Sequence, residues 1–146
     1  MGSLFRRDQQ ADGVNSLLNY GYTVLRAATA RAVVAAGLHP SIGIHHSHDN
    51  NAMRLVDDLM EPFRPVIDLT VWYLQMTGPC VVNAETKRTL VQSLYRDIAT
   101  KDGKTPVIVA VQKLATSLAQ VLLGERKELD LPVSVLTVYS ITTPDE

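Results

Sequence analysis

Cysteine, aromatic residues and net charge are all scarce in this sequence, and each scarcity excludes a class of protein. Cys80 is the only cysteine, so an internal disulfide and a zinc ribbon of paired Cys-x-x-Cys motifs are both excluded. The net charge of −1 gives no overall attraction to nucleic acid, so any DNA contact must come from a local basic group. No run of roughly 18 apolar residues and no signal peptide is present, which favours an intracellular protein without a membrane span.

The composition predicts a single folded domain that packs mainly through aliphatic side chains. The chain has 146 residues, of which 46% are hydrophobic and 20% are charged, as is usual for one folded domain. Because aromatic residues make up only 5%, the core must depend on leucine, valine and alanine. This composition favours closely packed helices over an aromatic-rich β-sandwich.

One long helix is predicted from Asp12 onwards. Small and apolar residues recur at steps of three and four along residues 14–32, which gives this segment one apolar face. Asp12 is the expected N-cap, and Gly37 can adopt the left-handed conformation that ends a helix. Small residues on the apolar face, Gly21 among them, predict that another helix packs unusually close there.

Four further helices are indicated by apolar periodicity together with capping and helix-breaking residues. They cover about residues 51–61, 65–76, 84–99 and 106–124. Pro62 disfavours helical geometry in the residue before it, so the first of these helices ends or kinks there. Asn83 is the expected cap of the third, and Thr105-Pro106 is a cap followed by a first-turn proline. Residues 131–141 are rich in β-branched side chains and fit a short strand or an extended arm. The predicted fold class is an all-α multi-helix bundle, with this stretch as a short extended C-terminal tail.

The first residues differ in character from the rest of the chain. Met1-Gly2-Ser3 is similar to a cloning remnant. The sequence from Leu4 onwards starts abruptly, without the segment that usually precedes a first structural element. We therefore interpret residues 1–11 as a tag remnant or truncated lead-in, and residues 12–146 as one helical domain. On this interpretation the chain is a piece of a longer protein.

Histidines and carboxylates are concentrated in residues 45–65, HHSHDNNAMRLVDDLMEPFRP. Three of the four histidines of the chain, His45, His46 and His48, fall within four positions. The helix that follows carries acidic residues at positions 57, 58 and 61. Imidazole with carboxylates suits Mn²⁺, Mg²⁺ or Zn²⁺, according to how many carboxylates join the site. The segment is therefore a candidate metal site.

Three polar residues of that helix share one face. Arg54, Asp58 and Glu61 are spaced at i, i+4 and i+7, opposite the apolar side of the helix. Arg64 follows just after the expected kink, where it can reach a phosphate or Glu61. His46 and Glu61 can share one ion only if the chain folds back along the helix, which is roughly 15 Å long. The sequence alone leaves this open.

The same residues also fit a protein without that metal site. His45 and His48 suit exposed or hydrogen-bonded loop positions, and Asp57 suits a solvated helix face. Arg54 and Asp58 suit an ordinary helical ion pair of about 0.3–0.5 kcal/mol. The main alternative function is a non-catalytic helical interaction module that holds zinc in the loop through His45 and His48.

The order of the residues carries more information than their spacing. Residues 15–46, NSLLNYGYTVLRAATARAVVAAGLHPSIGIHH, and residues 57–68, DDLMEPFRPVID, resemble the C-terminal helical domain of CRISPR-associated protein 1. Proteins of that family are metal-dependent DNA integrases that insert new spacers into CRISPR arrays in antiviral defence. The motif DLMEPFRPVID at 58–68 is similar to the form found in type II systems. A looser resemblance continues through TPVIVAVQKLA at 105–115.

The resemblance implies roles for individual residues. It implies that His46 and Glu61 bind one Mn²⁺ or Mg²⁺ ion, and that Asp58 and Arg64 act as catalytic neighbours of this ion. Nucleic-acid contacts are implied for Arg64, Tyr22 and Asn15.

The resemblance also implies what is missing and what the whole protein does. The family's first metal-binding glutamate lies upstream of NSLLNYGY, and no residue before Asp12 matches it; the β-domain that builds the homodimer has no counterpart either. We therefore expect an incomplete metal site and little activity from this chain by itself. For the whole protein, the resemblance implies an endonuclease and integrase that acts by phosphodiester transesterification in the prokaryotic cytoplasm. The implied partners are DNA (spacer precursor and CRISPR repeat), a second copy in a homodimer, and CRISPR-associated protein 2, with no membrane.

Overall fold

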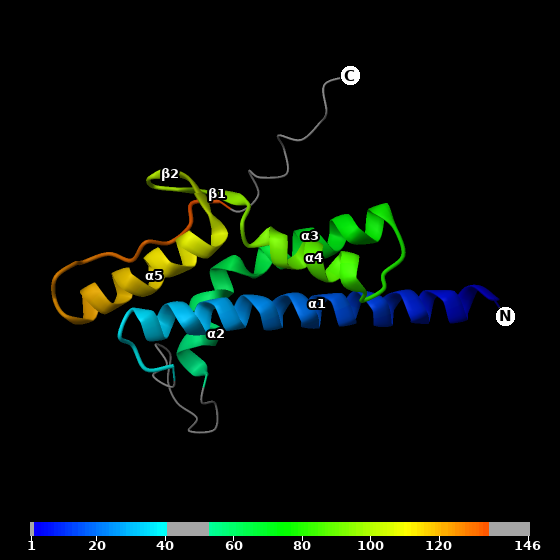
Figure 1. The fold of residues 1–146 in the computed structure, drawn as a ribbon, viewed down its shortest axis with the longest axis horizontal. Helices are drawn as coiled ribbons and strands as arrows, with labels where there is room; N and C mark the ends of the chain where they lie inside the picture. The colour runs from blue at the N-terminus through cyan, green and yellow to red at the C-terminus, as the bar shows by residue number, and fades with distance from the viewer. Residues whose placement is uncertain (1, 41–52, 135–146) are drawn as a thin grey trace, which may run out of the picture.

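The protein is arranged around one long helix. A computed structural model describes the backbone of residues 2–40 and 53–134, and the side chains of residues 11–40 and 53–134. The elements are α1 (Gly2–Ala35), α2 (Arg54–Met60), the 3₁₀ helix η1 (Glu61–Phe63), α3 (Arg64–Thr77), α4 (Ala84–Ser93), β1 (Asp97–Thr100), β2 (Gly103–Pro106) and α5 (Val107–Leu122). Helix α1 runs along the long axis of the molecule and contacts α2, α3, α4 and α5 (Figure 1). The core therefore lies along its buried side.

Helix α1 buries one side chain about every turn. Leu17, Leu25 and Val33 are fully buried, and the hydroxyl of the buried Thr29 donates to the Leu25 carbonyl oxygen at 2.8 Å. The helix ends as predicted at Gly37, whose φ of +80° is the left-handed conformation that glycine adopts without strain. The apolar periodicity of this segment was thus a reliable guide to its buried face.

The predicted N-cap at Asp12 is wrong. Helix α1 begins at Gly2 and passes through Asp12, whose backbone carbonyl accepts a hydrogen bond from the Ser16 hydroxyl at 2.8 Å. Residues 3–11 contain neither proline nor glycine, so nothing in the backbone stops the helix from extending toward the N-terminus. An aspartate caps a helix only where the preceding backbone leaves the helical conformation.

The predicted close approach at Gly21 is confirmed. A Cβ atom on this glycine would lie 2.5 Å from Cγ2 of Ile67 on α3 and 3.3 Å from Cδ2 of Leu90 on α4. A second close approach occurs at Gly13, where a Cβ would lie 1.9 Å from the carbonyl oxygen of Cys80. The absence of a side chain at these two positions lets α1 pack directly against the segments that follow α2.

Helices α2 and α3 agree closely with their predictions. Helix α2 runs from Arg54 to Met60, and its four buried residues are the predicted apolar side: Leu55, Val56, Leu59 and Met60. Pro62 lies in η1, so the helical path tightens at the predicted kink and then continues as α3. Phe63, fully buried, holds this turn on the core.

Helix α4 is shorter than predicted, because part of the expected helix forms a strand. The Asn83 cap is confirmed: its side chain accepts from the Thr86 backbone N–H at 3.0 Å, and the Thr86 hydroxyl caps Asn83 in return. Helix α4 nevertheless ends at Ser93, and residues 97–100 form β1, antiparallel to β2. Ile98 is buried opposite Thr105, and Gly103 turns the hairpin with a φ of +99°. The sequence pattern predicts helix through Ala99 because the pairing of β1 with β2 is a tertiary contact, which local periodicity does not encode.

The predicted cap at Thr105 is also wrong. Thr105 is a buried residue of β2, and Pro106 occupies the N-cap position of α5 with an extended ψ of 141°. The N–H groups of Val107 and Ile108 donate to the carbonyls of Arg96 and Leu94, at 2.9 and 2.8 Å. Carbonyl groups just after α4 therefore accept hydrogen bonds from the first free N–H groups of α5. The predicted end of α5 near Gly124 holds, with φ of +75° at that glycine.

The start of the predicted tail pairs as a strand does. The Val133 N–H donates to the Ala99 carbonyl at 2.9 Å, and the Ala99 N–H donates to the Ser134 carbonyl at 3.2 Å. Residues 135–141 of the predicted strand or arm lie outside the described residues. The fold class is the predicted mostly helical one, with the β1–β2 hairpin as an addition. Within residues 2–40 and 53–134, every helix is too short or too polar to cross a membrane.

Candidate nucleic-acid interface

The turn η1 places two charged residues on the surface next to each other. Glu61 opens the turn and Arg64 follows it, and both side chains are exposed. Phe63, between them, is buried and fixes the turn to the core. Because adjacent positions of a helical turn point in different directions, burying the phenylalanine directs its polar neighbours outward. The hydrophobic anchor is thus what presents the charged pair.

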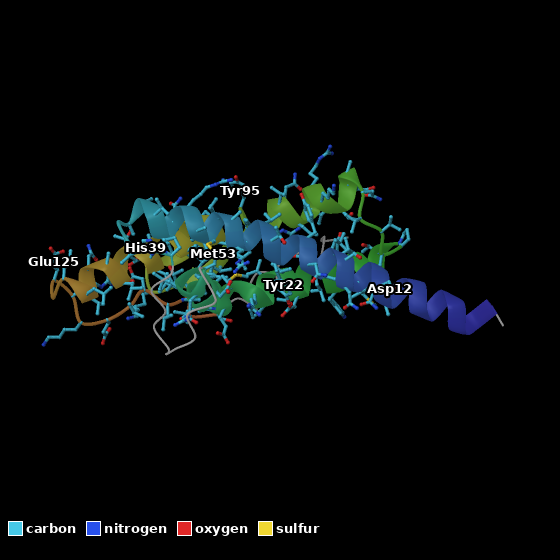
Figure 2. The ribbon with its side chains drawn as sticks, turned by 90° about the horizontal axis from the view of Figure 1, so that it is seen from below. Asp12, Tyr22, His39, Met53, Tyr95 and Glu125 are labelled. Atoms are coloured by element: carbon cyan, nitrogen blue, oxygen red, sulfur yellow. The ribbon has the colours of Figure 1, made fainter. Side chains whose placement is uncertain are left out.

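Tyr22 of α1 joins the two ends of the first turn of α3. Its hydroxyl donates a short hydrogen bond to Oδ1 of Asp68, and the guanidinium carbon of Arg64 lies 5.5 Å from the centroid of its ring. Figure 2 shows Tyr22 midway along α1, on the side that meets α3. Partial burial, then the Asp68 hydrogen bond and charge, raise the pKa of Tyr22 to about 12, although Arg64 acts in the opposite direction. Near neutral pH the phenol is therefore protonated and acts as a donor.

Arg26 of α1 forms an ion pair with Asp57 of α2. Its Nη2 donates to Oδ2 at 3.1 Å, and its Nε lies 2.9 Å from Oδ1 without the alignment of a hydrogen bond. The prediction that Asp57 is a solvated face residue is wrong, since about 29% of its side chain is exposed and it binds α1. A partly exposed pair of this kind contributes only about 0–1 kcal/mol.

An open groove lies between these contacts. Its volume is about 370 Å³, and it is lined by Asn19, Tyr22, Thr23, Arg26, Asp57, Met60 and Arg64. Two guanidinium groups border it, but they differ in charge balance, because Arg26 is paired with a carboxylate and Arg64 rests on an aromatic ring. A groove with cationic, amide and hydroxyl groups suits the phosphates and sugars of a nucleic-acid strand.

The structure brings together some of the predicted site residues. Tyr22 and Arg64 are in contact, and Glu61 lies one turn of helix before Arg64. Asp58 is half-buried on α2, and Asn15 is exposed on α1, two turns before Tyr22 and not among the groove-lining residues.

The histidine half of the predicted metal site falls within residues 41–52. His45, His46 and His48 lie outside the described residues, so the predicted approach of His46 to Glu61 remains a prediction. In the part of the chain that is described, no group of three or more histidine, cysteine, aspartate or glutamate side chains could hold a metal ion. Glu61 is thus the one predicted ligand for which a position is known.

Two residues of the interface were not predicted. Arg26 and Asp68 take part in its two cross-helix contacts, and neither was singled out in the sequence. A local signal existed for both: Arg26 is one turn from Tyr22, and Asp68 is one turn from Arg64. Their partners are 31 and 46 positions away along the chain, so only the tertiary structure could identify them.

Comparison with known sequences agrees with the resemblance seen in the motifs. The model of the family described as CRISPR associated protein Cas1 matches residues 5–95. The CRISPR-associated endonuclease Cas1 of Neisseria meningitidis serogroup C (strain 8013) is 35% identical over 134 residues, which are 90% of this chain and 44% of the relative. A CRISPR-associated endonuclease Cas1 of Thermus thermophilus is 46% identical over 94 residues, or 56% of this chain and 30% of the relative. The chain spans less than half the length of these relatives.

A solved structure supports the fold. A casposase bound to integration product superimposes with a TM-score of 0.67 at 24% sequence identity, covering 80% of this chain and 39% of that one. At this sequence identity, the structural similarity supports only the arrangement of the helices.

Proposed function

The chain belongs to the Cas1 family of CRISPR-associated proteins, and from this premise we propose that it is the helical, DNA-contacting part of an integrase that inserts spacers into CRISPR arrays. The observation that carries the proposal is the placement of Arg64. Its guanidinium rests on the Tyr22 ring beside an open groove, directly after the turn that exposes Glu61. In this proposal the whole protein works on DNA as a homodimer with CRISPR-associated protein 2, in the prokaryotic cytoplasm.

The proposed reaction is a phosphodiester exchange. The 3′-oxygen of one DNA end bonds to the phosphorus at the repeat boundary as the bond from that phosphorus to another 3′-oxygen breaks. One hydroxyl loses its proton and the other gains one, so the number of phosphodiester bonds is unchanged. With water as the attacking group, the same site acts as an endonuclease. Arg64 contributes by holding a non-bridging phosphate oxygen with a planar cation, which suits the charge of the pentacoordinate phosphorus.

The proposed metal ligands are His46 and Glu61. An exposed carboxylate with an imidazole is a donor set that fits Mn²⁺ or Mg²⁺. Such an ion, when bound, polarises the phosphoryl oxygen and stabilises negative charge in the transition state. Asp58, one turn before Glu61 on the same face, is proposed as a polar neighbour of this site.

We expect the 146-residue chain to bind Mn²⁺ only weakly and to join DNA inefficiently. One carboxylate and one imidazole provide little Coulomb attraction for a divalent ion compared with a site of two carboxylates. Isothermal titration with Mn²⁺ should give a dissociation constant well above the micromolar range. Sub-micromolar affinity would mean that the chain holds a complete site.

In the whole protein, we expect His46→Ala and Glu61→Gln each to abolish strand transfer. Each substitution removes one donor from the proposed ion, and Glu61→Gln keeps the shape of the side chain. Because Glu61 is exposed, its substitution should change the free energy of unfolding by no more than about 0.5 kcal/mol. The measurement is joining of a labelled DNA end to a CRISPR repeat, with thermal unfolding as the control. Joining at the unsubstituted rate in either variant removes that residue from the site.

A further inference from the structure

Three side chains at the start of α3 form an unusual arrangement of charges. Arg64 and Asp68 are one turn apart on the same helix, a spacing that allows an ion pair. Among the residues that the structure describes, Arg64 instead has the Tyr22 ring as its neighbour, and Asp68 accepts from the Tyr22 hydroxyl. The tyrosine thus contacts both the cation through its ring and the anion through its hydroxyl.

The consequence differs for the two arginines of the groove. Within the described residues, the charge of Arg26 is matched by the two oxygens of Asp57, whereas Arg64 has no carboxylate within ion-pair distance. Stacking on a ring leaves the N–H groups at the edge of a guanidinium able to bind a phosphate. Of the two, Arg64 is therefore the arginine ready to take an anion from outside.

We infer that Asp68 is a positioning residue: by accepting the hydrogen bond of Tyr22, it fixes the ring that holds Arg64 ready for a phosphate of the bound DNA strand. This inference rests on the proposed function. Asp68 acts through Tyr22 and does not touch the DNA.

A comparison of Asp68→Asn with Asp68→Ala separates this role from an electrostatic one. Both substitutions remove a negative charge near the DNA, and an effect of charge alone would raise the affinity equally in both. Asparagine still offers a carbonyl oxygen to the Tyr22 hydroxyl, whereas alanine offers nothing. If Asp68 positions the ring, Asp68→Asn keeps or improves DNA affinity, while Asp68→Ala lowers it by about three- to tenfold, as expected for loss of an oriented polar contact.

The experiment measures binding of the 146-residue chain to a fluorescently labelled DNA duplex by anisotropy over a series of salt concentrations. Asp102→Ala and Asp102→Asn are matched controls, because Asp102 is an exposed aspartate of the β1–β2 turn that pairs with Lys113. Thermal unfolding of each variant verifies the fold. Equal affinities for Asp68→Asn and Asp68→Ala, with the unsubstituted chain binding normally, would overturn the positioning role and leave the proposed function intact. Failure of the unsubstituted chain to bind DNA would overturn both.

A spectroscopic measurement tests the contact without DNA. Ionisation of tyrosine is followed by ultraviolet absorbance, and subtraction of the curve for Tyr22→Phe isolates Tyr22 from the other four tyrosines. Burial is the largest cause of the raised pKa of Tyr22 and remains in Asp68→Ala, but the Asp68 hydrogen bond and charge add to it, so this pKa should fall below about 12 in that variant. An unchanged titration in Asp68→Ala would show that the hydrogen bond does not hold the ring, and would overturn the inference whatever the DNA measurement gives.

Discussion

At the scale of single residues, what matters most is how each charge is balanced. Arg26 and Arg64 border one groove, yet of the two only Arg26 pairs with a carboxylate in the part of the chain that the structure describes. A guanidinium paired with a carboxylate has its charge partly neutralised and some of its N–H donors in use, whereas a stacked one keeps its charge and its donors for a phosphate. The two arginines should therefore respond differently to substitution, although both carry the same formal charge.

We expect Arg64→Ala to weaken DNA binding and to lower the salt dependence of binding by about one unit of slope in a plot of log affinity against log salt. Arg64→Lys should keep most of the slope but lose affinity, because an ammonium lacks the planar face that stacks on Tyr22. Fluorescence anisotropy at several salt concentrations measures both quantities. Arg31→Ala is the control, an exposed arginine of α1 in a different groove. A slope unchanged by Arg64→Ala would exclude Arg64 as a phosphate contact.

The sequence was informative about residues that belong to a local motif and uninformative about their distant partners. Tyr22 and Arg64 were named from the resemblance, and the structure places them in contact. Asp57 was misread as solvated because its partner Arg26 lies 31 positions earlier, across a helix pairing that no local pattern encodes. The same limit hid Asp68.

At the scale of elements, close packing of α1 depends on the absence of a side chain at Gly21. We expect Gly21→Ala to destabilise the protein, since a Cβ there would lie 2.5 Å from Cγ2 of Ile67. Overpacking costs about 1–3 kcal/mol, which should exceed the roughly 1 kcal/mol that alanine gains over glycine in a helix. The measurement is chemical denaturation of the variant and of the unsubstituted chain.

Two further variants test the cause. Gly78→Ala is the control, because its φ of 177° is extended and a Cβ there has no neighbour within 4 Å, so it should be neutral or slightly stabilising. Combined with Ile67→Ala, Gly21→Ala should cost less than it does alone, since the obstructing methyl group is then gone. Strictly additive effects would place the cost elsewhere than at the Gly21–Ile67 contact.

Local end signals are reliable at Asn83 and Gly37 but fail at Asp12 and Thr105, and the hairpin formed by strand pairing is not predicted. Asn83 and Gly37 mark helix ends through their own chemistry, so a single sequence reveals them. Ile98 fits a helical pattern and a strand pattern equally, and the choice is made by Thr105 on the opposite strand. The hairpin was missed for this reason.

At the scale of the whole molecule, Cys80 can report on global unfolding. Its side chain is buried and its carbonyl packs against Gly13 of α1. Burial also raises the pKa of the thiol, so at a given pH less of it is the reactive thiolate than in a free cysteine. We expect a thiol reagent at pH 8 to label the folded chain at least about a hundredfold more slowly than the unfolded chain.

The rate should rise with pH as the thiolate forms, and with denaturant as the molecule opens. Ellman's reagent gives the rate directly, because the chain has no other cysteine. Met76→Ala is a suitable control, since that side chain is exposed and its removal should leave the protection unchanged. Labelling at the rate of an unfolded peptide, without denaturant, would show that the region around Cys80 opens independently of the core.

A helix that every other helix touches also determines how the protein can be divided. Cleavage between residues 40 and 53 would give one piece that is a lone helix, about 51 Å long at 1.5 Å per residue, and another whose helices have lost the surface they share. Neither piece would keep the core whole, because Leu17, Leu25 and Val33 belong to the first and the residues they pack against belong to the second. The complete core would re-form only when the two pieces meet, so α1 supplied as a separate peptide should bind the remainder and restore its stability.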